Sequence, residues 1–269
     1  LGMVLPQTCG GKLKDIHWFR TDWQRGGALT GYAVWCDDDQ PDKQVVVKLP
    51  VSPTERSWLI HLDSVGGVAP KLYAHGETVG GYDFAWVVME RLPYGPISDS
   101  WGGHGFDLMI EAAGRFYAAA ESAPMKSQFG ARDWQSIAER ARESVHRHNL
   151  VHEQRWNKAL KQAHRKLKNW LSIWNDRPTD QWCHGDMHLA NAMTRLPAPQ
   201  GPAMLFDYAM CHKGHWVEDA VYFEHLFWAR RERLEGRAGR FGAQLHLAAQ
   251  QSAIGPQAAQ QELRVGRGR

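Results

Sequence analysis

Three polar side chains in the second half of the chain have a spacing that could serve phosphoryl transfer. In the segment WCHGDMHLANAM, residues 182–193, Asn191 follows Asp186 by five residues, and Asp207 lies 16 residues beyond Asn191 at the end of the apolar run MLF. Phosphoryl transfer needs a carboxylate that accepts or orients the attacking hydroxyl, and oxygen ligands for the Mg²⁺ that neutralises the phosphates. These three side chains could supply both, because Mg²⁺ takes few protein oxygens and uses the substrate phosphates as further ligands.

The same segment resembles the signature of the aminoglycoside phosphotransferase and choline kinase family. That signature is HGDxHxxN followed by a short apolar strand that ends in Asp, and this chain matches it without a gap. The resemblance implies that Asp186 is the catalytic base, that Asn191 and Asp207 bind Mg²⁺, and that His184 braces the loop. It also implies a structural role behind the loop for Asp219.

The first third of the chain agrees with the same family. Lys48 stands near the end of the run QVVVKL, where the family places the lysine that binds the α- and β-phosphates. Glu55 opens the next helix and is the expected partner that holds the lysine ammonium in position. The resemblance therefore assigns both residues to the nucleotide site.

Two further segments are expected to contact the nucleotide. Gly26 and Gly27, with Gly31, fit a flexible turn over the phosphates, whose backbone amides could approach an anion closely. The strand that ends near Leu92 resembles the hinge against which adenine packs, with the backbone from Glu90 to Leu92 contacting the base. The cofactors implied are Mg²⁺ and ATP or GTP.

Each of these features has a simpler explanation when it stands alone. The HGD triplet could be a turn, Lys48 an ordinary strand-end lysine, and Gly26-Gly27 a hairpin turn. Glu55 could be only the third residue of a capping box, and Asp207 a strand-end cap. Their order along the chain, which is the family's order, favours the kinase interpretation.

The elements that must position these residues change from strands to helices along the chain. Strands are predicted over 29–36, 44–49 and 84–92, with an acidic turn over 37–43 ending the first of them. Between the last two, Ser52 can cap a helix that has Pro53 at its first position. The apolar residues of this helix, Trp58, Leu59 and Leu62, fit one face.

Helical spacing dominates after the turn at residues 93–96. Helices are predicted over 108–122, 134–149 and 156–174, the last with a buried stripe. The stripe consists of Trp156, Leu160, Ala163, Leu167, Trp170, Leu171 and Trp174. The opposite face is basic and is interpreted as solvated; it consists of Lys158, Lys161, Arg165, Lys166 and Lys168.

The predicted fold class is therefore α+β, a bilobal protein-kinase-like fold. We expect a nucleotide-binding lobe over residues 1–92, with a small antiparallel sheet and one helix, and a mainly helical catalytic and acceptor-binding lobe over 93–269. The tail from about residue 237 is rich in Ala, Gln, Gly and Arg, and its order is an open question.

Composition limits the kinds of partner. The 269 residues carry a net charge of only +3, so nucleic acid is not the expected partner. The chain has no apolar run long enough for a membrane span and no segment typical of a secretory signal, so a cytoplasmic enzyme without a membrane partner is expected. The cysteines are interpreted as cytosolic thiols; Cys183-His184 and Cys211-His212 could in principle bind a metal, although adjacent residues in an extended segment point to opposite faces.

The predicted activity is Mg²⁺-dependent transfer of the γ-phosphate of ATP or GTP to a hydroxyl of a small molecule. A protein kinase fits less well, because Gly185 replaces the arginine usual there and the interval from Asp207 to Asp219 leaves little room for an activation segment. A nucleotide-binding module without activity is the alternative of another class. The acceptor and the oligomeric state stay open.

Overall fold

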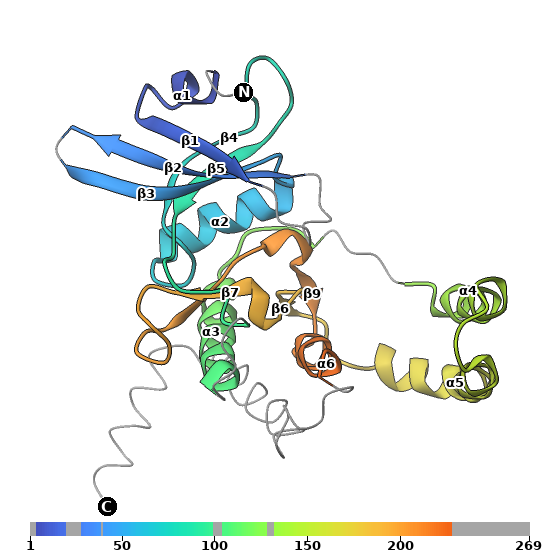
Figure 1. Ribbon diagram of the computed structural model, residues 1–269. Helices are drawn as coiled ribbons and strands as arrows, with labels where there is room; N and C mark the ends of the chain where they lie inside the picture. Colours follow the sequence, from blue (N-terminus) through green and yellow to red (C-terminus); the bar gives the residue numbers. More distant parts are fainter. Residues whose placement is uncertain (1–3, 20–27, 39, 99–103, 128–131, 228–269) are drawn as a thin grey trace, which may run out of the picture. The chain divides into compact units, whose positions relative to one another are not determined.

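The structure is a computed structural model that describes residues 4–19, 28–38, 40–98, 104–127 and 132–227 (Figure 1). Gly26, Gly27 and the tail from residue 237 lie outside the described residues. The strands are β1 (Leu13–Phe19), β2 (Leu29–Asp37), β3 (Gln40–Leu49), β4 (Leu72–Gly76), β5 (Trp86–Glu90), β6 (Gln181–Cys183), β7 (Ala192–Thr194), β8 (Ala203–Leu205) and β9 (His212–Gly214). The helices are α1 (Val4–Thr8), α2 (Pro53–Val65), α3 (His104–Ala120), α4 (Trp134–Arg147), α5 (Glu153–Asn175) and α6 (Val217–His225), with the 3₁₀ turns η1 (Leu189–Asn191) and η2 (Tyr208–Met210).

The first five strands form one antiparallel sheet in the order β1-β2-β3-β5-β4. On β3 the side chains of Val45, Val47 and Leu49 are buried, in a cluster with residues of α1 and the neighbouring strands. Because side chains alternate along a strand, Lys48 lies on the opposite face of the sheet. That is the face on which its contact with helix α2 is made, as described below.

The strand boundaries differ from the sequence prediction in β2, β3 and β5; β2 extends to Asp37, and β5 covers only Trp86–Glu90 of the predicted strand 84–92. β3 begins at Gln40 and not at residue 44, since Gln40 pairs with Asp37 of β2 and extends the ladder between the two strands. Pro41 is tolerated because it lies beside a shift in the β2–β3 register, where the ladder is irregular. Gly31 lies inside β2, paired with Trp18 and Val47, and is not part of a turn.

Helix α2 begins as its sequence predicts. Ser52 is the N-cap, with its side chain accepting a hydrogen bond from the Glu55 amide at 3.1 Å, and Pro53 occupies the first turn. The helix ends at Val65, followed by Gly66 with a positive φ of 80°. This start fixes Glu55 in the first turn of α2, beside the end of β3.

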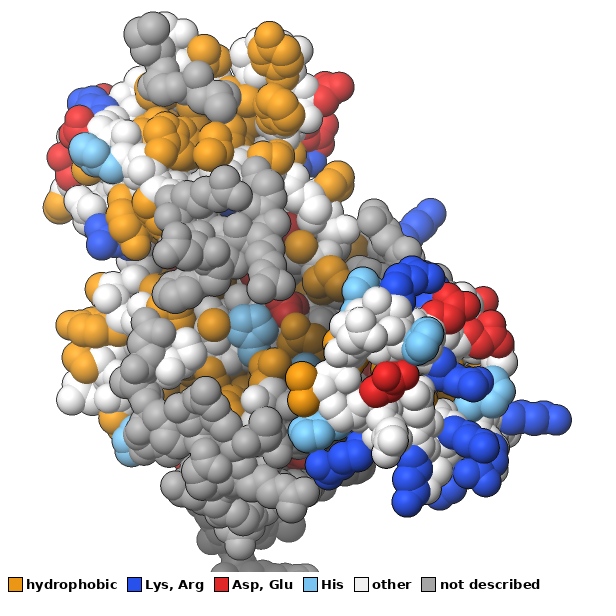
Figure 2. All heavy atoms as spheres, turned by 45° about the vertical axis from the view of Figure 1, so that its right-hand side comes forward, with side chains coloured by type: hydrophobic (Ala, Val, Ile, Leu, Met, Phe, Trp, Pro, Cys, Tyr) orange, Lys and Arg blue, Asp and Glu red, His pale blue; other side chains and the backbone are white. Residues whose placement is uncertain are grey.

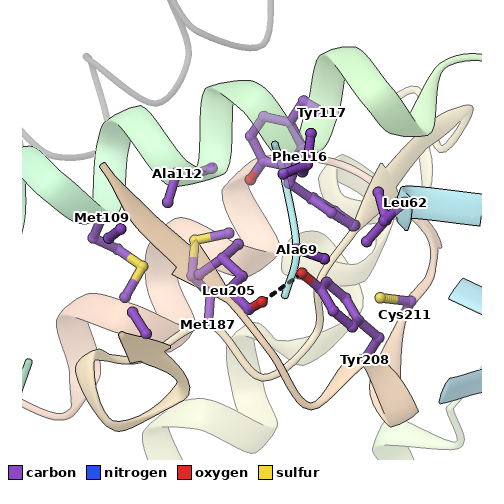
Figure 3. Packing of buried hydrophobic residues seen from close by; sticks show 14 of the residues in the cluster. Leu62, Ala69, Met109, Ala112, Phe116, Tyr117, Met187, Leu205, Tyr208 and Cys211 are labelled. Carbon is purple, nitrogen blue, oxygen red and sulfur yellow. Dashed lines mark hydrogen bonds between the residues drawn. The ribbon is translucent and has the colours of Figure 1, made fainter. Parts of the chain in front are cut away.

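One hydrophobic cluster joins α2 to the later part of the chain. Figure 3 shows Leu62 of α2 in the same cluster as Phe116 of α3 and Leu205 of β8, and Met187 of the HGD loop belongs to it as well. The Tyr208 hydroxyl, buried in this cluster, donates to the Leu205 carbonyl at 2.6 Å. Helix α2 and the segment that carries Asp186 therefore share a core, which can hold their polar residues in a fixed relation.

Residues 128–180 form a separate compact unit, which contains α4 and α5. The predicted buried stripe on α5 is wrong, because no residue of this helix is buried and Trp156 and Trp170 are about half exposed, at 51% and 48%. α5 packs against α4, and a single neighbouring helix covers only part of an apolar face. The five predicted basic residues are all exposed, and Figure 2 shows Lys and Arg side chains gathered over this unit.

The predicted boundary between two lobes near residue 92 stays a prediction, because the division seen here separates only the α4–α5 unit. No helix in the described part of the chain is long and apolar enough to cross a membrane.

Candidate functional site

The carboxylate of Asp186 is held by three neighbouring side chains. Its Oδ2 accepts a hydrogen bond from Asn191 Nδ2 at 2.9 Å, and its Oδ1 accepts one from the Tyr222 hydroxyl at 2.5 Å. His188 Nε2 lies 3.6 Å from Oδ1. Burial acts to raise the pKa of Asp186, but these neighbours outweigh it and lower the pKa to about 2. Asp186 is therefore an ionised carboxylate throughout the neutral range.

The turn that carries Asp186 is braced from behind by buried groups. Asp219 of α6 accepts hydrogen bonds from the backbone amides of His184, at 2.9 Å, and Gly185, at 2.8 Å, and a third from the Tyr117 hydroxyl at 3.0 Å. Burial raises the pKa of Asp219, opposed by His184 and by these donors, which favour the charged form. The bracing role that the resemblance implied for Asp219 matches this geometry.

Two residues of the turn itself are specialised. His184 is buried and contacts the Phe206 carbonyl through Nε2 at 3.2 Å, so Nε2 carries the proton and Nδ1 accepts from the Asp186 amide at 3.3 Å. Burial lowers the pKa of His184, in keeping with a neutral ring. Gly185 has φ of 80°, and a Cβ there would lie 2.2 Å from the Met210 carbonyl oxygen, so only glycine fits.

Asn191 and Asp207 lie at the same end of the β7–β8 hairpin. Ala192 pairs with Leu205 in that hairpin, and the Phe206 amide donates to the Asn191 carbonyl at 3.1 Å. Asp207 adopts a left-handed backbone, with φ of 65°, which costs about 1 kcal/mol for a residue with a Cβ. Such a conformation directly after a strand is a feature of sites where one side chain must point in a particular direction.

Lys48 joins the sheet to this hairpin through two ion pairs. Its Nζ lies 2.6 Å from Glu55 Oε1 and 3.3 Å from Asp207 Oδ1. Burial acts to lower the pKa of Lys48, but the two carboxylates outweigh it and raise the pKa. Burial raises the pKa of Glu55, and the ammonium of Lys48 opposes that shift. The structure thus brings Lys48, Glu55 and Asp207 together.

The segment expected to contact a nucleotide base follows β5. The Glu90 amide donates to the Lys71 carbonyl, and the Arg91 amide donates to the Gln44 carbonyl. These two amides are therefore already used in hydrogen bonds to neighbouring backbone. The Glu90 side chain forms a bidentate ion pair with Arg195, at 2.6 and 2.5 Å. Of the amides from Glu90 to Leu92, that of Leu92 is the candidate donor to a base.

Several contacts of the site do not follow from the sequence motifs. Tyr222 lies on α6, 36 residues beyond Asp186, and Arg195 lies 105 residues beyond Glu90. No local pattern marks either residue, because each meets its partner only through the tertiary fold. His188 is part of the HxxN spacing, but its contact with Asp186 was not predicted.

Comparison with known proteins decides the family. The model of a phosphotransferase enzyme family matches residues 30–249, most of the chain. The chain belongs to this family. A search of curated proteins finds none that matches.

Solved structures of phosphotransferases share the fold. A thermostable mutant of aminoglycoside phosphotransferase APH(4)-Ia, in ternary complex with ADP and hygromycin B, has a TM-score of 0.54 at 12% identity, over 90% of this chain and 82% of that chain. The GDP complex of an aminoglycoside 2′-phosphotransferase-IIIa mutant has a TM-score of 0.54 at 14% identity, over 94% of this chain and 87% of that one. The predicted α+β kinase-like fold is confirmed, and the chain is a member of a phosphotransferase family with that fold.

Proposed function

We propose that this phosphotransferase moves the γ-phosphate of ATP or GTP to a hydroxyl of a small molecule, with Mg²⁺ as cofactor. The observation that carries the proposal is Lys48, whose ammonium lies between Glu55 and Asp207 in the structural unit that also holds the Asp186–Asn191 pair. A lysine ammonium beside a carboxylate that can bind Mg²⁺ suits the binding of nucleotide phosphates.

The nucleotide would lie between the sheet and the catalytic segment. Lys48 would contact the α- and β-phosphates, and the backbone from Glu90 to Leu92 would meet the base. Gly26 and Gly27, outside the described residues, would cover the phosphates. Aminoglycoside phosphotransferases of the same fold have been solved with ADP and with GDP, which supports a nucleotide site and leaves the choice of base to experiment.

The residues Asn191 and Asp207 fit Mg²⁺. Asn191 Nδ2 donates to both the carbonyl oxygen and the carboxylate of Asp186, at 3.0 and 2.9 Å, so its side-chain oxygen is the end that can meet a cation. Asp207 adds a carboxylate, and both ligands are hard oxygens, the type that Mg²⁺ prefers. When bound, Mg²⁺ would neutralise charge on the phosphates.

Asp186 would orient the acceptor. The acceptor oxygen forms a bond to the γ-phosphorus, the bond from that phosphorus to the bridging oxygen breaks, and the nucleoside diphosphate leaves. The hydroxyl proton passes to the Asp186 carboxylate. With a pKa of about 2 this group is a weak base, so its main contribution is to accept a hydrogen bond and aim the hydroxyl. Each carboxylate oxygen has two lone pairs, so the bonds from Asn191 and Tyr222 leave capacity for the acceptor.

A small hydroxylated acceptor is favoured over a peptide. After Asp207 the chain passes through one 3₁₀ turn into β9 and α6, with no separate activation segment in this described stretch. From Asp207 onward the sequence has no surplus of acidic residues, and the candidate carboxylates for a cationic acceptor are Glu218, Glu224 and Glu232, the last outside the described residues. Glu218 accepts from the His215 amide at 3.1 Å and contacts His212 at 3.2 Å. It is therefore occupied by neighbours, and an aminoglycoside is not favoured over a sugar or an amino alcohol.

The test is acceptor-dependent release of nucleoside diphosphate. Purified protein would be incubated with Mg²⁺ and ATP or GTP over a panel of aminoglycosides, macrolides, amino alcohols and sugars. The test variant is Asp186→Asn, which keeps the shape of the side chain, and the matched control is Asp83→Asn at an exposed loop position. We expect turnover to fall by at least about a hundredfold in Asp186→Asn and to be unchanged in Asp83→Asn.

Two other results would be informative. Tight nucleotide binding without acceptor-dependent turnover over the whole panel would favour the alternative, a nucleotide-binding module. A protein that binds neither ATP nor GTP in a calorimetric titration with Mg²⁺ would contradict the proposed function.

A further inference from the structure

Three metal-ligating side chains from three elements meet beside the catalytic turn. Cys183 ends β6, His212 begins β9, and Glu218 lies in the first turn of α6. The sulfur, a ring nitrogen and a carboxylate oxygen of these residues all lie within 4.8 Å of one another. None of the three belongs to the nucleotide or Mg²⁺ site proposed above, so the cluster calls for a separate explanation.

The fold brings the three together for local reasons. β6 and β9 lie side by side and pair antiparallel (Figure 1). Cys183 is directly opposite His212 in this pairing, so the two side chains lie on the same face of the ladder. The His215 amide donates to Glu218 Oε1 at 3.1 Å, in the manner of a capping box, and this turns the other oxygen, Oε2, toward His212.

The protonation of His212 can be read from its partners. Its Nδ1 lies 2.9 Å from the Met210 carbonyl oxygen, which can only accept, so Nδ1 carries a proton. A ring nitrogen bonded in this way to a backbone carbonyl is the usual arrangement for a histidine whose other nitrogen binds a metal. Nε2 is that other nitrogen, and it faces Glu218 Oε2 at 3.2 Å.

A lone pair on Nε2 and a carboxylate oxygen can face each other at 3.2 Å only with a proton or a cation between them. If Nε2 carries a second proton, His212 and Glu218 form a simple ion pair, in which the Cys183 sulfur takes no part. A metal ion would use the sulfur as well. Two ligands bound at about 2.1 Å with tetrahedral geometry lie about 3.4 Å apart, close to the separation seen here.

Gly214 lies directly against two of the candidate ligands. A Cβ at this position would lie 2.6 Å from Glu218 Oε1 and 3.2 Å from Cys183 Sγ. Any larger residue would therefore push two of the three candidate ligands apart. The Cys183 thiol donates a hydrogen bond to the His215 carbonyl at 3.3 Å, and a metal ion would take the place of this proton when it binds the sulfur.

We propose that Cys183, His212 and Glu218 bind a zinc-type transition-metal ion, with water as the fourth ligand. A thiolate and a carboxylate balance the charge of a divalent ion, and the sulfur–nitrogen–oxygen set suits zinc and not Mg²⁺. Cys183 directly precedes His184, and Glu218 directly precedes Asp219, which braces the turn. The ion would tie β6, β9 and the start of α6 together behind Asp186 and add its binding energy to the stability of the fold.

The test is a titration of metal-free, reduced protein with Co²⁺ in excess Mg²⁺. Thiolate-bound cobalt gives a near-ultraviolet charge-transfer band, which cobalt bound by the oxygens of Asn191 and Asp207 cannot give. We expect this band together with tetrahedral visible bands, saturation at one ion per chain, and displacement of the cobalt by Zn²⁺. Zinc should also raise the thermal midpoint of the metal-free protein.

Variants assign the ligands. Cys183→Ser should abolish the charge-transfer band, and His212→Gln should weaken zinc binding by more than about a hundredfold, since even partners one shell further out matter by 10- to 100-fold. The matched control is Cys36→Ser, a half-buried cysteine on β2, which should change nothing.

Two results would overturn the proposal. Wild-type protein with no thiolate-to-cobalt band would leave His212 and Glu218 as a plain ion pair, whatever the variants do. A band that persists in folded Cys183→Ser would place the metal on another cysteine. Asp186→Asn should bind zinc as the wild type does, so failure of the proposed phosphotransfer and failure of this metal site are separate outcomes.

Discussion

At the scale of single residues, the contact between Lys48 and Glu55 can be separated into a structural and a functional part. Lys48→Met leaves the Glu55 carboxyl buried, at 3% exposure, without its cation. Removing one partner of a buried pair destabilises by about 3 kcal/mol, whereas removing both charges is much less costly. We therefore expect Lys48→Met to be strongly destabilised and the double variant Lys48→Met/Glu55→Gln to regain most of the loss.

Urea unfolding of the wild type, the two single variants and the double variant measures this coupling. Calorimetry on the same four proteins should show that nucleotide affinity is lost wherever Lys48 is lost and does not return in the double variant. Additive losses of stability would contradict the coupling, and restored nucleotide binding would contradict the assigned role of Lys48.

The pKa values of Asp186 and Tyr222 predict that neither group makes the acceptor kcat/KM depend on pH near neutrality. The pKa is lowered to about 2, so the carboxylate is already ionised well below neutral pH, and Tyr222, with a pKa raised to about 12 chiefly by burial, keeps its proton. Neither group titrates between about pH 5 and pH 9. The kcat/KM for the acceptor should show no inflection from either group in that range.

Tyr222→Phe removes one of the hydrogen bonds that lower the pKa of Asp186. The pKa should rise by about one unit and still lie below the assay range, so the shape of the profile should not change. The lost positioning should lower kcat/KM by about tenfold while nucleotide affinity stays the same. An acidic limb near neutral pH that moves in Tyr222→Phe would show that Asp186 is protonated more easily than this structure implies.

At the scale of elements, helix α6 acts on the catalytic turn through Asp219. This carboxylate accepts hydrogen bonds from two backbone amides and from the Tyr117 hydroxyl. The side chain of an asparagine at the same position would turn an NH₂ group, itself a donor, toward at least one of these three donors. We expect Asp219→Asn to destabilise by about 3 kcal/mol and to abolish turnover, while Tyr117→Phe loses about 1 kcal/mol. Thermal unfolding and the diphosphate assay check both; a fully active Asp219→Asn would contradict the bracing role.

The elements also show which parts of the site a sequence can predict. Ser52, Pro53 and Glu55 lie within one helical turn, so their capping geometry is local and was predicted correctly. The five-residue interval between Asp186 and Asn191 is local in the same way, and one hydrogen bond spans it. Patterns of this kind are fixed by backbone geometry, which short-range spacing encodes.

Contacts that depend on the packing of distant elements could not be predicted. Cys183 and His212 are two of the four possible metal ligands that the sequence indicates, but the sequence does not say which of the four meet. Cys183 meets His212 because two short strands pair, and three-residue strands have no periodicity that predicts a partner. Gly31 was grouped with Gly26 and Gly27 as a turn over the phosphates, although it also falls in the predicted strand 29–36. It lies inside β2 beside the ring of Trp18, where a Cβ would come within 3.0 Å. In both cases the deciding neighbour comes from a different strand.

At the scale of the whole molecule, burial is distributed unevenly between the two compact units. Nine residues of α3 are buried, whereas none of the 23 residues of α5 is. The spacing of apolar residues on α5 indicates an amphipathic helix but does not say how much of the apolar face a neighbour covers. The stability of α5 must then come mainly from its contact with α4, since isolated helices are marginal in water.

Uneven burial predicts uneven protection of the backbone amides. Segments with few buried apolar contacts open locally at low free energy, while core segments exchange only through global unfolding. Hydrogen exchange followed by mass spectrometry should show the amides of α5 exchanging at least about a hundredfold faster than those of α3. Helix α2, which buries Trp58, Leu59 and Leu62, is the internal control and should resemble α3. Equal protection of α5 and α3 would mean that the exposed side chains of Trp156 and Trp170 are covered in solution.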